Sequence, residues 1–105
     1  MAITNTRLDS INPTTVFDAV GQQAITVMYL CNTTSTTCSA NVFIINSDDS
    51  TSSADTNMVY SQLEITANDT YVISSEKIIL DDNDLIEVEA NIADCLTITV
   101  SSISV

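Results

Sequence analysis

At 105 residues the chain has room for one domain with a single core, and its 45% hydrophobic content excludes a disordered acidic tail. The formal net charge is −12, because Arg7 and Lys77 are the only basic residues against 14 acidic ones. Nucleic-acid binding needs clustered cations, so this balance excludes a phosphate-binding surface and disfavours an anionic membrane. We expect neither nucleic acid nor membrane among the partners.

The residue pattern of the first 22 positions predicts strands separated by turns. Residues 2–8 alternate loosely, so residues 1–22 are expected to contribute an edge strand or an N-terminal arm. A turn is predicted at residues 12–15, where Pro13 presets its own dihedral and cannot donate to a sheet. Residues 16–20 fit no single pattern. Gly21 then marks a tight bend.

Two strongly apolar strands are predicted next, at residues 24–31 and 40–46. The first is apolar on both faces apart from Thr26, which indicates a central strand covered on both sides or packed against another subunit. The Thr/Ser-rich residues 32–39 between them read as a turn. We expect the two strands to pair as a hairpin and to form the core.

The second half predicts a β-meander over residues 60–90, preceded by a long polar loop at residues 47–57. A four-residue polar turn at residues 81–84 separates two of its strands. The last strand, residues 95–105, alternates almost to the final residue. Seven to eight strands with turns about every ten residues predict an all-β fold: a single-domain antiparallel β-sandwich over residues 1–105, in a jelly-roll or Ig-like order.

The three cysteines are an odd number in a chain that begins without a recognisable export signal. We expect reduced thiols that act as small strand hydrophobes, or a Cys31–Cys38 bridge across the predicted hairpin. Zinc is not expected, because the chain has no histidine and the cysteine spacing does not match a zinc site. No apolar run reaches the length of a membrane span, so synthesis in the cytoplasm is expected.

No catalytic or cofactor-binding residue is predicted. Histidine is absent, and a single glycine excludes a glycine-rich phosphate loop. Glu87 and Glu89 share a strand face, but the chain has no tryptophan for sugar stacking, so a glycosidase is not expected. Two aspartate-rich loops offer oxygen ligands for calcium, but neither has the EF-hand pattern, so we expect solvated turn aspartates and no metal.

The outward strand positions carry Thr and Ser, and the chain has few lysines that could protect the edge strands of the predicted sheets from pairing. Unprotected edges favour pairing with other chains, so a homo-oligomer or larger assembly is expected. The loops are the expected contact regions. The candidate partner-contact residues are Asn32, Thr34, Asp48, Asp49, Asp55, Asp81, Asp82 and Asp84.

The order of several segments resembles small virion structural proteins of tailed bacteriophages, especially phages of marine bacteria. The segments are YLCN (residues 29–32), VYSQLEI (59–65), DTYV (69–72), EKIIL (76–80), DDNDLIEVEA (81–90) and LTITVSSISV (96–105). The resemblance implies a β-sandwich subunit that is present in many copies on a virion and is made in the host cytoplasm.

Within that resemblance, small size and acidity favour a capsid decoration or cement protein that contacts the major capsid protein. A protein of the neck, tail or fibres is the alternative. A receptor- or carbohydrate-binding module is a further hypothesis from a different class, and aromatic side chains that stack on sugars would be its expected feature. The aromatic residues available are Phe17, Tyr29, Phe43, Tyr60 and Tyr71.

Overall fold

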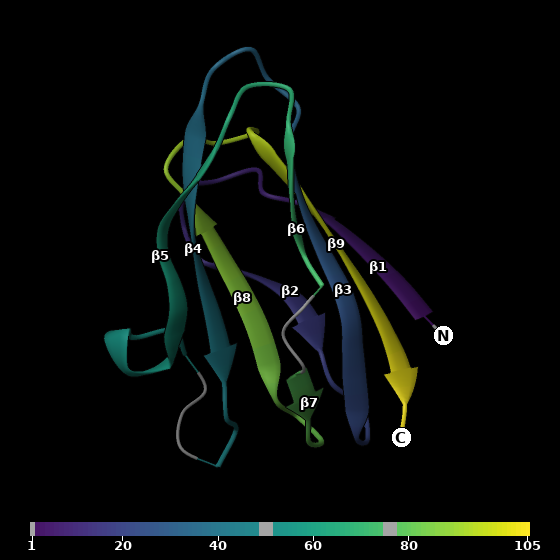
Figure 1. Ribbon diagram of the computed structural model, residues 1–105. Coiled ribbons are helices and arrows are strands. Elements are labelled where there is room, and N and C mark those ends of the chain that lie inside the picture. The colour runs from purple at the N-terminus through teal and green to yellow at the C-terminus, as the bar shows by residue number, and fades with distance from the viewer. Residues whose placement is uncertain (1, 49–51, 75–77) are drawn as a thin grey trace.

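The computed structural model describes residues 2–48, 52–74 and 78–105 and shows two antiparallel sheets packed face to face (Figure 1). The first sheet has the order β1-β9-β3-β6, with β7 also paired to β3, and the second has the order β2-β8-β4-β5. The elements are β1 (Ala2–Arg7), β2 (Thr14–Asp18), β3 (Gln23–Asn32), β4 (Cys38–Ile45), η1 (Asp55–Asn57), β5 (Met58–Ile65), β6 (Thr70–Ile73), β7 (Ile78–Leu80), β8 (Leu85–Ala90) and β9 (Leu96–Ser104). Among the described residues no helix is long and apolar enough to cross a membrane.

The strand order is that of a jelly roll. Both β6 and β7 pair with β3, β6 with its C-terminal half and β7 with its N-terminal half, so they act as one interrupted strand. Counted that way, the sheets contain the first, eighth, third and sixth strands and the second, seventh, fourth and fifth strands, which is the jelly-roll arrangement of two packed sheets. The predicted antiparallel β-sandwich is therefore confirmed, and the first of its two predicted orders is the one observed.

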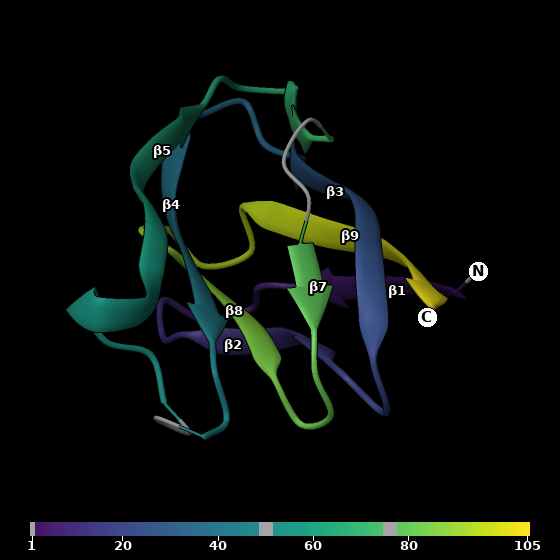
Figure 2. The ribbon, with the colours of Figure 1, turned by 60° about the horizontal axis from the view of Figure 1, so that its bottom comes forward.

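Two predicted pairings are wrong. The apolar strands β3 and β4 lie in different sheets and do not form a hairpin, and the predicted meander is divided, with β5 and β8 in one sheet and β6 and β7 in the other. Figure 2 shows the chain crossing from one sheet to the other between β3 and β4, between β5 and β6 and between β7 and β8. The physical reason is that alternation identifies the buried face of a strand but says nothing about the sheet to which it belongs.

The core is formed by the facing sides of the two sheets. Met28 and Leu30 of β3 point inward from the first sheet, while Ile86 and Val88 of β8 point inward from the second, and all four are buried. Strand β3 is not covered on both sides, however, because the Tyr29 side chain on its other face is 41% exposed. Its apolar outer face is thus open in the single chain.

A disulfide joins Cys38 and Cys95, which contradicts both the reduced thiols and the Cys31–Cys38 bridge expected from the sequence. Cys38 begins β4 of the second sheet and Cys95 directly precedes β9 of the first, and both are buried in the core. Cys31 is the free cysteine, and it lies beside Thr97 on the opposite side of β3 from the core. The disulfide therefore links the two sheets at one end of the sandwich.

Candidate functional site

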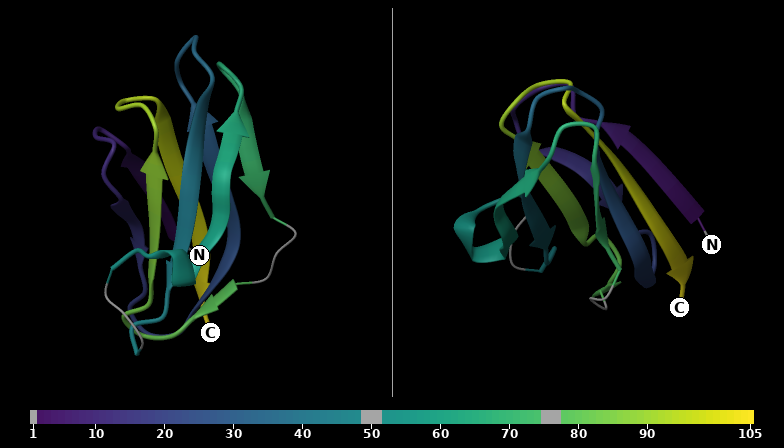
Figure 3. Two further views of the ribbon diagram at one scale, coloured as in Figure 1. Left: turned by 90° about the vertical axis from the view of Figure 1, so that its left-hand side faces the viewer. Right: turned by 45° about the horizontal axis from the view of Figure 1, so that its top comes forward.

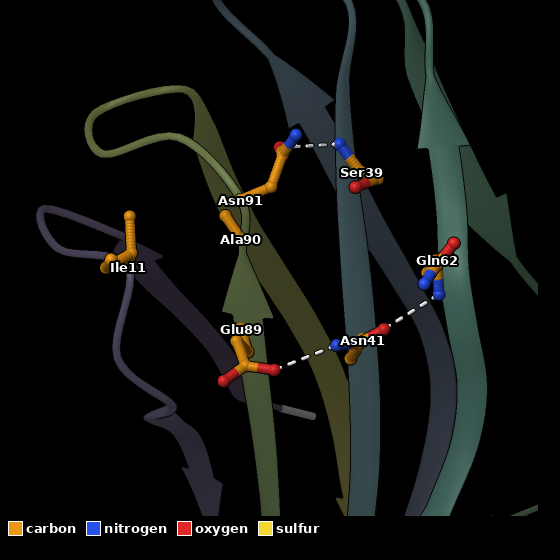
Figure 4. Close-up of a pocket in the computed structure, with 7 residues that line it drawn as sticks. All are labelled: Ile11, Ser39, Asn41, Gln62, Glu89, Ala90 and Asn91. Carbon is orange, nitrogen blue, oxygen red and sulfur yellow. Dashed lines mark hydrogen bonds between the residues drawn. The ribbon is translucent and has the colours of Figure 1, made fainter.

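A polar groove of about 300 Å³ lies on the outer face of the second sheet (Figure 4). It crosses β5, β4 and β8, and one side is closed by Ile11 from the segment before β2. We call it the amide groove, because three of the seven residues that line it carry side-chain amides. The polar residues that line it are Ser39, Asn41, Gln62, Glu89 and Asn91.

Hydrogen bonds across the strands fix the floor of the amide groove. The Asn41 Nδ2 donates to Glu89 Oε1 over 2.8 Å, and its Oδ1 accepts the backbone N–H of Gln62 over 2.7 Å. Farther along β4, the backbone N–H of Ser39 donates to Asn91 Oδ1 over 2.8 Å. Both ends of the Asn41 amide are engaged, so its orientation is set by its neighbours on either side.

A β-bulge in β5 brings Gln62 to the groove. The register steps from Ala40–Leu63 to Val42–Tyr60, so two residues of β5 lie opposite Asn41. Gln62 adopts φ 53°, a left-handed conformation that costs a non-glycine residue about 1 kcal/mol or more. Bulges of this kind re-aim a side chain. The Asn41 side-chain Oδ1 accepts the backbone N–H of Gln62 and so stabilises this conformation.

The predicted contact residues that the structure describes do not lie in this groove, and they do not form one site. The β3–β4 connection, which holds Thr34 and follows Asn32, and the turn of residues 81–84 between β7 and β8 lie at opposite ends of the sandwich (Figure 3). Asp48 and Asp55 are exposed in the β4–β5 connection and at the start of η1, respectively. Asp49 lies outside the described residues. In the described ranges no group of three or more metal-ligating side chains is found.

Asn32 is interior, at 1% exposure, and so its side chain is not displayed to a partner. Its Nδ2 donates to the carbonyl oxygens of Thr36 (2.8 Å) and Ile65 (3.0 Å), which ties β3 to β5 of the other sheet. Its Oδ1 accepts from the Thr34 backbone N–H (2.9 Å) and hydroxyl (2.8 Å). Asn32 and Thr34 are thus structural residues that order the β3–β4 connection.

The acidic turn at residues 81–84 is also engaged within the chain. Asp82 Oδ1 accepts the Gly21 backbone N–H over 2.8 Å, and Asp81 Oδ1 accepts from the Gln22 side chain over 3.1 Å. Asp84 accepts from the Ser47 backbone N–H (2.9 Å), the Ser47 hydroxyl (3.1 Å) and the Asp81 backbone N–H (2.9 Å). These carboxylates hold three connections together, whereas the sequence suggested solvated turn aspartates.

Partial burial raises the pKa of Asp84, but the hydrogen bonds from Ser47 and Asp81 outweigh it, so the net pKa lies below its ordinary value. A lowered folded-state pKa gives stability that is present above the unfolded-state pKa of about 4 and is lost as the pH falls through the folded value. Asp84→Asn should therefore cost about 1–2 kcal/mol at neutral pH, because the new amide cannot accept the Asp81 N–H.

Urea unfolding of wild type and Asp84→Asn at pH 7 and at about pH 2 measures this effect, and the two proteins should converge at the acidic pH. The matched control is Asp55→Asn, at an exposed position of η1, which should change stability by less than about 0.5 kcal/mol. Equal effects of the two substitutions at pH 7 would contradict a structural role for Asp84.

The aromatic residues do not supply a sugar-stacking platform in the amide groove. Phe17 and Phe43 are buried, and the rings of Tyr60 and Tyr71 meet edge to face, with centroids 6.3 Å apart, across the two sheets. Tyr60 also borders a separate apolar hollow of about 160 Å³, between the edges of the sheets. Tyr29 lies on the outer face of the first sheet, away from the groove.

The outer faces of the two sheets differ in charge. The register places Glu64, Glu87 and Glu89 on the outer face of the second sheet. Among the described strand positions on the outer face of the first sheet, none is acidic and only Arg7 is charged. Asp94, in the β8–β9 connection at the end of this sheet, pairs with Arg7, with Arg7 Nε and Asp94 Oδ1 3.7 Å apart. We call this outer face the carboxylate-free face. Its outward positions are Ile3, Asn5, Arg7, Ala24, Val27, Tyr29, Cys31, Thr70, Val72, Ile79, Thr97, Thr99, Ser101 and Ile103.

Compared with protein-family models, with curated proteins and with solved structures, the chain has no match in any of the three.

The sequence reasoning did not identify Asn41, Gln62 or Asn91, the residues that form the amide groove together with Glu89. One signal for Asn41 was available, because it is a polar residue within the apolar run of residues 40–46. For Gln62 and Asn91 the sequence has no comparable signal, since the bulge and the strand register bring them to the groove.

Proposed function

We propose that the chain is a structural subunit of a virus particle, present in many copies as a capsid decoration or cement protein. The observation that supports it best is the carboxylate-free face on a chain of net charge −12. A position in the neck, tail or fibres is the alternative within the same proposal. The chain is not proposed to be an enzyme.

The carboxylate-free face suits contact with a second copy of the chain. Two copies that meet through the outer faces of their second sheets would bring glutamates such as Glu87 and Glu89 together, and like charges at an interface are repelled. Contact through the carboxylate-free face avoids this and covers Tyr29, Val72 and Ile79, which are 41%, 47% and 64% exposed. Burial of these side chains supplies a hydrophobic contribution to association.

The face is small for a stable dimer. It offers fewer residues than the roughly 20–30 a side that form a standard interface. An isolated pair would therefore be weak, and many copies anchored on one particle would strengthen it through effective concentration. A lattice of copies fits this surface better than a free dimer does.

The jelly-roll fold and the disulfide are both compatible with a virion protein, although neither is specific to one. The jelly roll is used by viral capsid proteins and also by lectins, so the fold alone does not select a function. The Cys38–Cys95 disulfide suits an oxidising environment, and virion surfaces are among the places where disulfides persist.

The proposal is tested by quantitative mass spectrometry of purified particles of the virus that encodes the chain. A decoration or cement protein should be present at a ratio to the major capsid protein near one or at a simple fraction of it. A few copies per particle would instead indicate the neck, tail or fibres. Absence from the particles would overturn the proposal.

Val72→Glu should abolish self-association, because it places a carboxylate on the carboxylate-free face, in the edge strand β6 and directly beside Tyr29 of β3. The matched control is Val20→Glu, which makes the same chemical change at an 80% exposed position in the β2–β3 connection. Sedimentation velocity over a concentration series should show reversible dimers for the wild type and for Val20→Glu but monomers for Val72→Glu. Identical behaviour of the two variants would contradict the assigned interface.

A further inference from the structure

Several polar groups of the amide groove face solvent without a partner in the described part of the chain. These groups are the side-chain amide of Gln62, the Nδ2 of Asn91, the hydroxyl of Ser39 and the Oε2 of Glu89. The Asn41 amide, in contrast, is held at both ends, because its Nδ2 donates to Glu89 and its Oδ1 accepts from the backbone N–H of Gln62. The result is a preorganised floor with free donors and acceptors at its rim, which is the arrangement of a binding site.

From this arrangement we infer that the amide groove binds a neutral saccharide. Primary amides and a hydroxyl each offer both donors and acceptors, and the Glu89 carboxylate is a strong acceptor. Vicinal hydroxyl groups present the complementary mixture at short spacing. A groove of about 300 Å³ is at the lower end of the range for small-ligand sites, which fits one or two sugar rings.

Other ligand classes fit the groove less well. An anion would meet Glu89 in the groove, with Glu64 and Glu87 on the same face. A lysine or arginine side chain would satisfy the carboxylate but has no acceptor for the N–H groups of Gln62 and Asn91. A neutral polyol satisfies both kinds of group.

Affinity in this groove should be modest. Ile11 provides an apolar wall for the C–H groups of a sugar, but none of the described residues that line the groove has an aromatic ring to stack on it. We expect a dissociation constant of about 1 mM for a single groove. Many copies on one surface would raise the effective affinity by multivalency.

The inference does not rest on the proposed function. The amide groove lies on the outer face of the second sheet, whereas the carboxylate-free face lies on the first. A copy that is attached through the first sheet would therefore display the groove outward. Loss of self-association in Val72→Glu tests the assembly and leaves sugar binding intact.

The experiment is a titration of the ¹⁵N-labelled chain with neutral saccharides, namely maltose, cellobiose, lactose and N-acetylglucosamine, followed by amide chemical shifts. At least one sugar should shift the side-chain amides of Gln62 and Asn91. The key variant is Gln62→Gly, because glycine accepts φ 53° without strain, so the side chain with its amide is removed while the bulge is kept. It should lower the affinity at least tenfold without loss of folding, whereas Glu64→Gln, on the same strand and face outside the groove, should bind as the wild type does.

Two results would overturn the inference. One is the absence of any shift at the groove with each of the four sugars at about 50 mM, well above the expected dissociation constant. The other is binding of a trilysine peptide in their place, retained in Gln62→Gly and lost in Glu89→Gln, which would assign the groove to basic peptides.

Discussion

Reduction of the Cys38–Cys95 disulfide should lower the free energy of unfolding by about 4 kcal/mol, which is the largest single effect we expect in this chain. The two cysteines are 57 residues apart, and in the chain-entropy description the stabilisation grows with the length of the closed loop. For a domain of this size the loss corresponds to a decrease in Tm of roughly 15–25 °C. Thermal unfolding followed by circular dichroism, with and without a thiol reductant, measures it.

The control for this prediction is Cys31→Ser. Cys31 is the free cysteine, so its replacement removes a thiol without touching the disulfide, and reductant should lower the Tm of this variant as much as that of the wild type. The double variant Cys38→Ala/Cys95→Ala should unfold near the reduced wild type and show no response to reductant. A reductant effect that disappears in Cys31→Ser would instead mean that Cys31 takes part in the disulfide.

The same disulfide bears on where the protein matures. Synthesis in a reducing cytoplasm would leave both thiols reduced, and disulfides form mainly after exposure to an oxidising environment. A typical domain has only 5–15 kcal/mol of stability, so about 4 kcal/mol decides whether the reduced chain is firmly folded or marginal. If the chain is the virion protein proposed above, the bond would form only after the particles leave the reducing host cytoplasm.

The sequence predicts those features of the fold that depend on residues close together in the chain, and it does not predict those that depend on contacts between distant residues. The last strand is predicted at residues 95–105 and is observed at Leu96–Ser104, and Gly21 adopts φ 70° at the predicted bend. Both are local features that the residues themselves encode. The distribution of strands between sheets is not local, because β3 and β4 have equally apolar sequences and occupy different layers.

The candidate sites likewise depend on how the fold places residues that are distant from one another in the sequence. Polar residues in a Thr-rich turn suggested an exposed contact region, yet Asn32 is buried because its side chain takes the place of missing backbone partners. The disulfide joins residues from opposite sheets, and the amide groove joins Asn41, Gln62 and Asn91 from neighbouring segments that only the register aligns. Neither could be found from spacing alone.

Asn32→Asp should destabilise the chain by about 3 kcal/mol at neutral pH, although the two side chains have nearly the same shape. The Asn32 Nδ2 donates to two carbonyl oxygens, at 2.8 and 3.0 Å, in an interior position. A carboxylate oxygen in its place would face both carbonyls without a donor, and an unpaired buried charge adds the cost of desolvation. Urea unfolding at pH 7 measures the difference.

The dependence of this loss on pH separates it from a simple packing defect. Burial against two carbonyl oxygens raises the pKa of the introduced carboxyl in the folded state, so the folded variant binds its proton more tightly than the unfolded chain does. The variant should therefore regain stability relative to the wild type as the pH falls from 7 to about 4. The matched control is Asn91→Asp, at an exposed position whose Oδ1 accepts the Ser39 N–H and would remain an acceptor, so its stability should change by less than about 0.5 kcal/mol. If Asn32→Asp and Asn91→Asp cost the same, then Asn32 is not the buried link between β3 and β5 that its hydrogen bonds indicate.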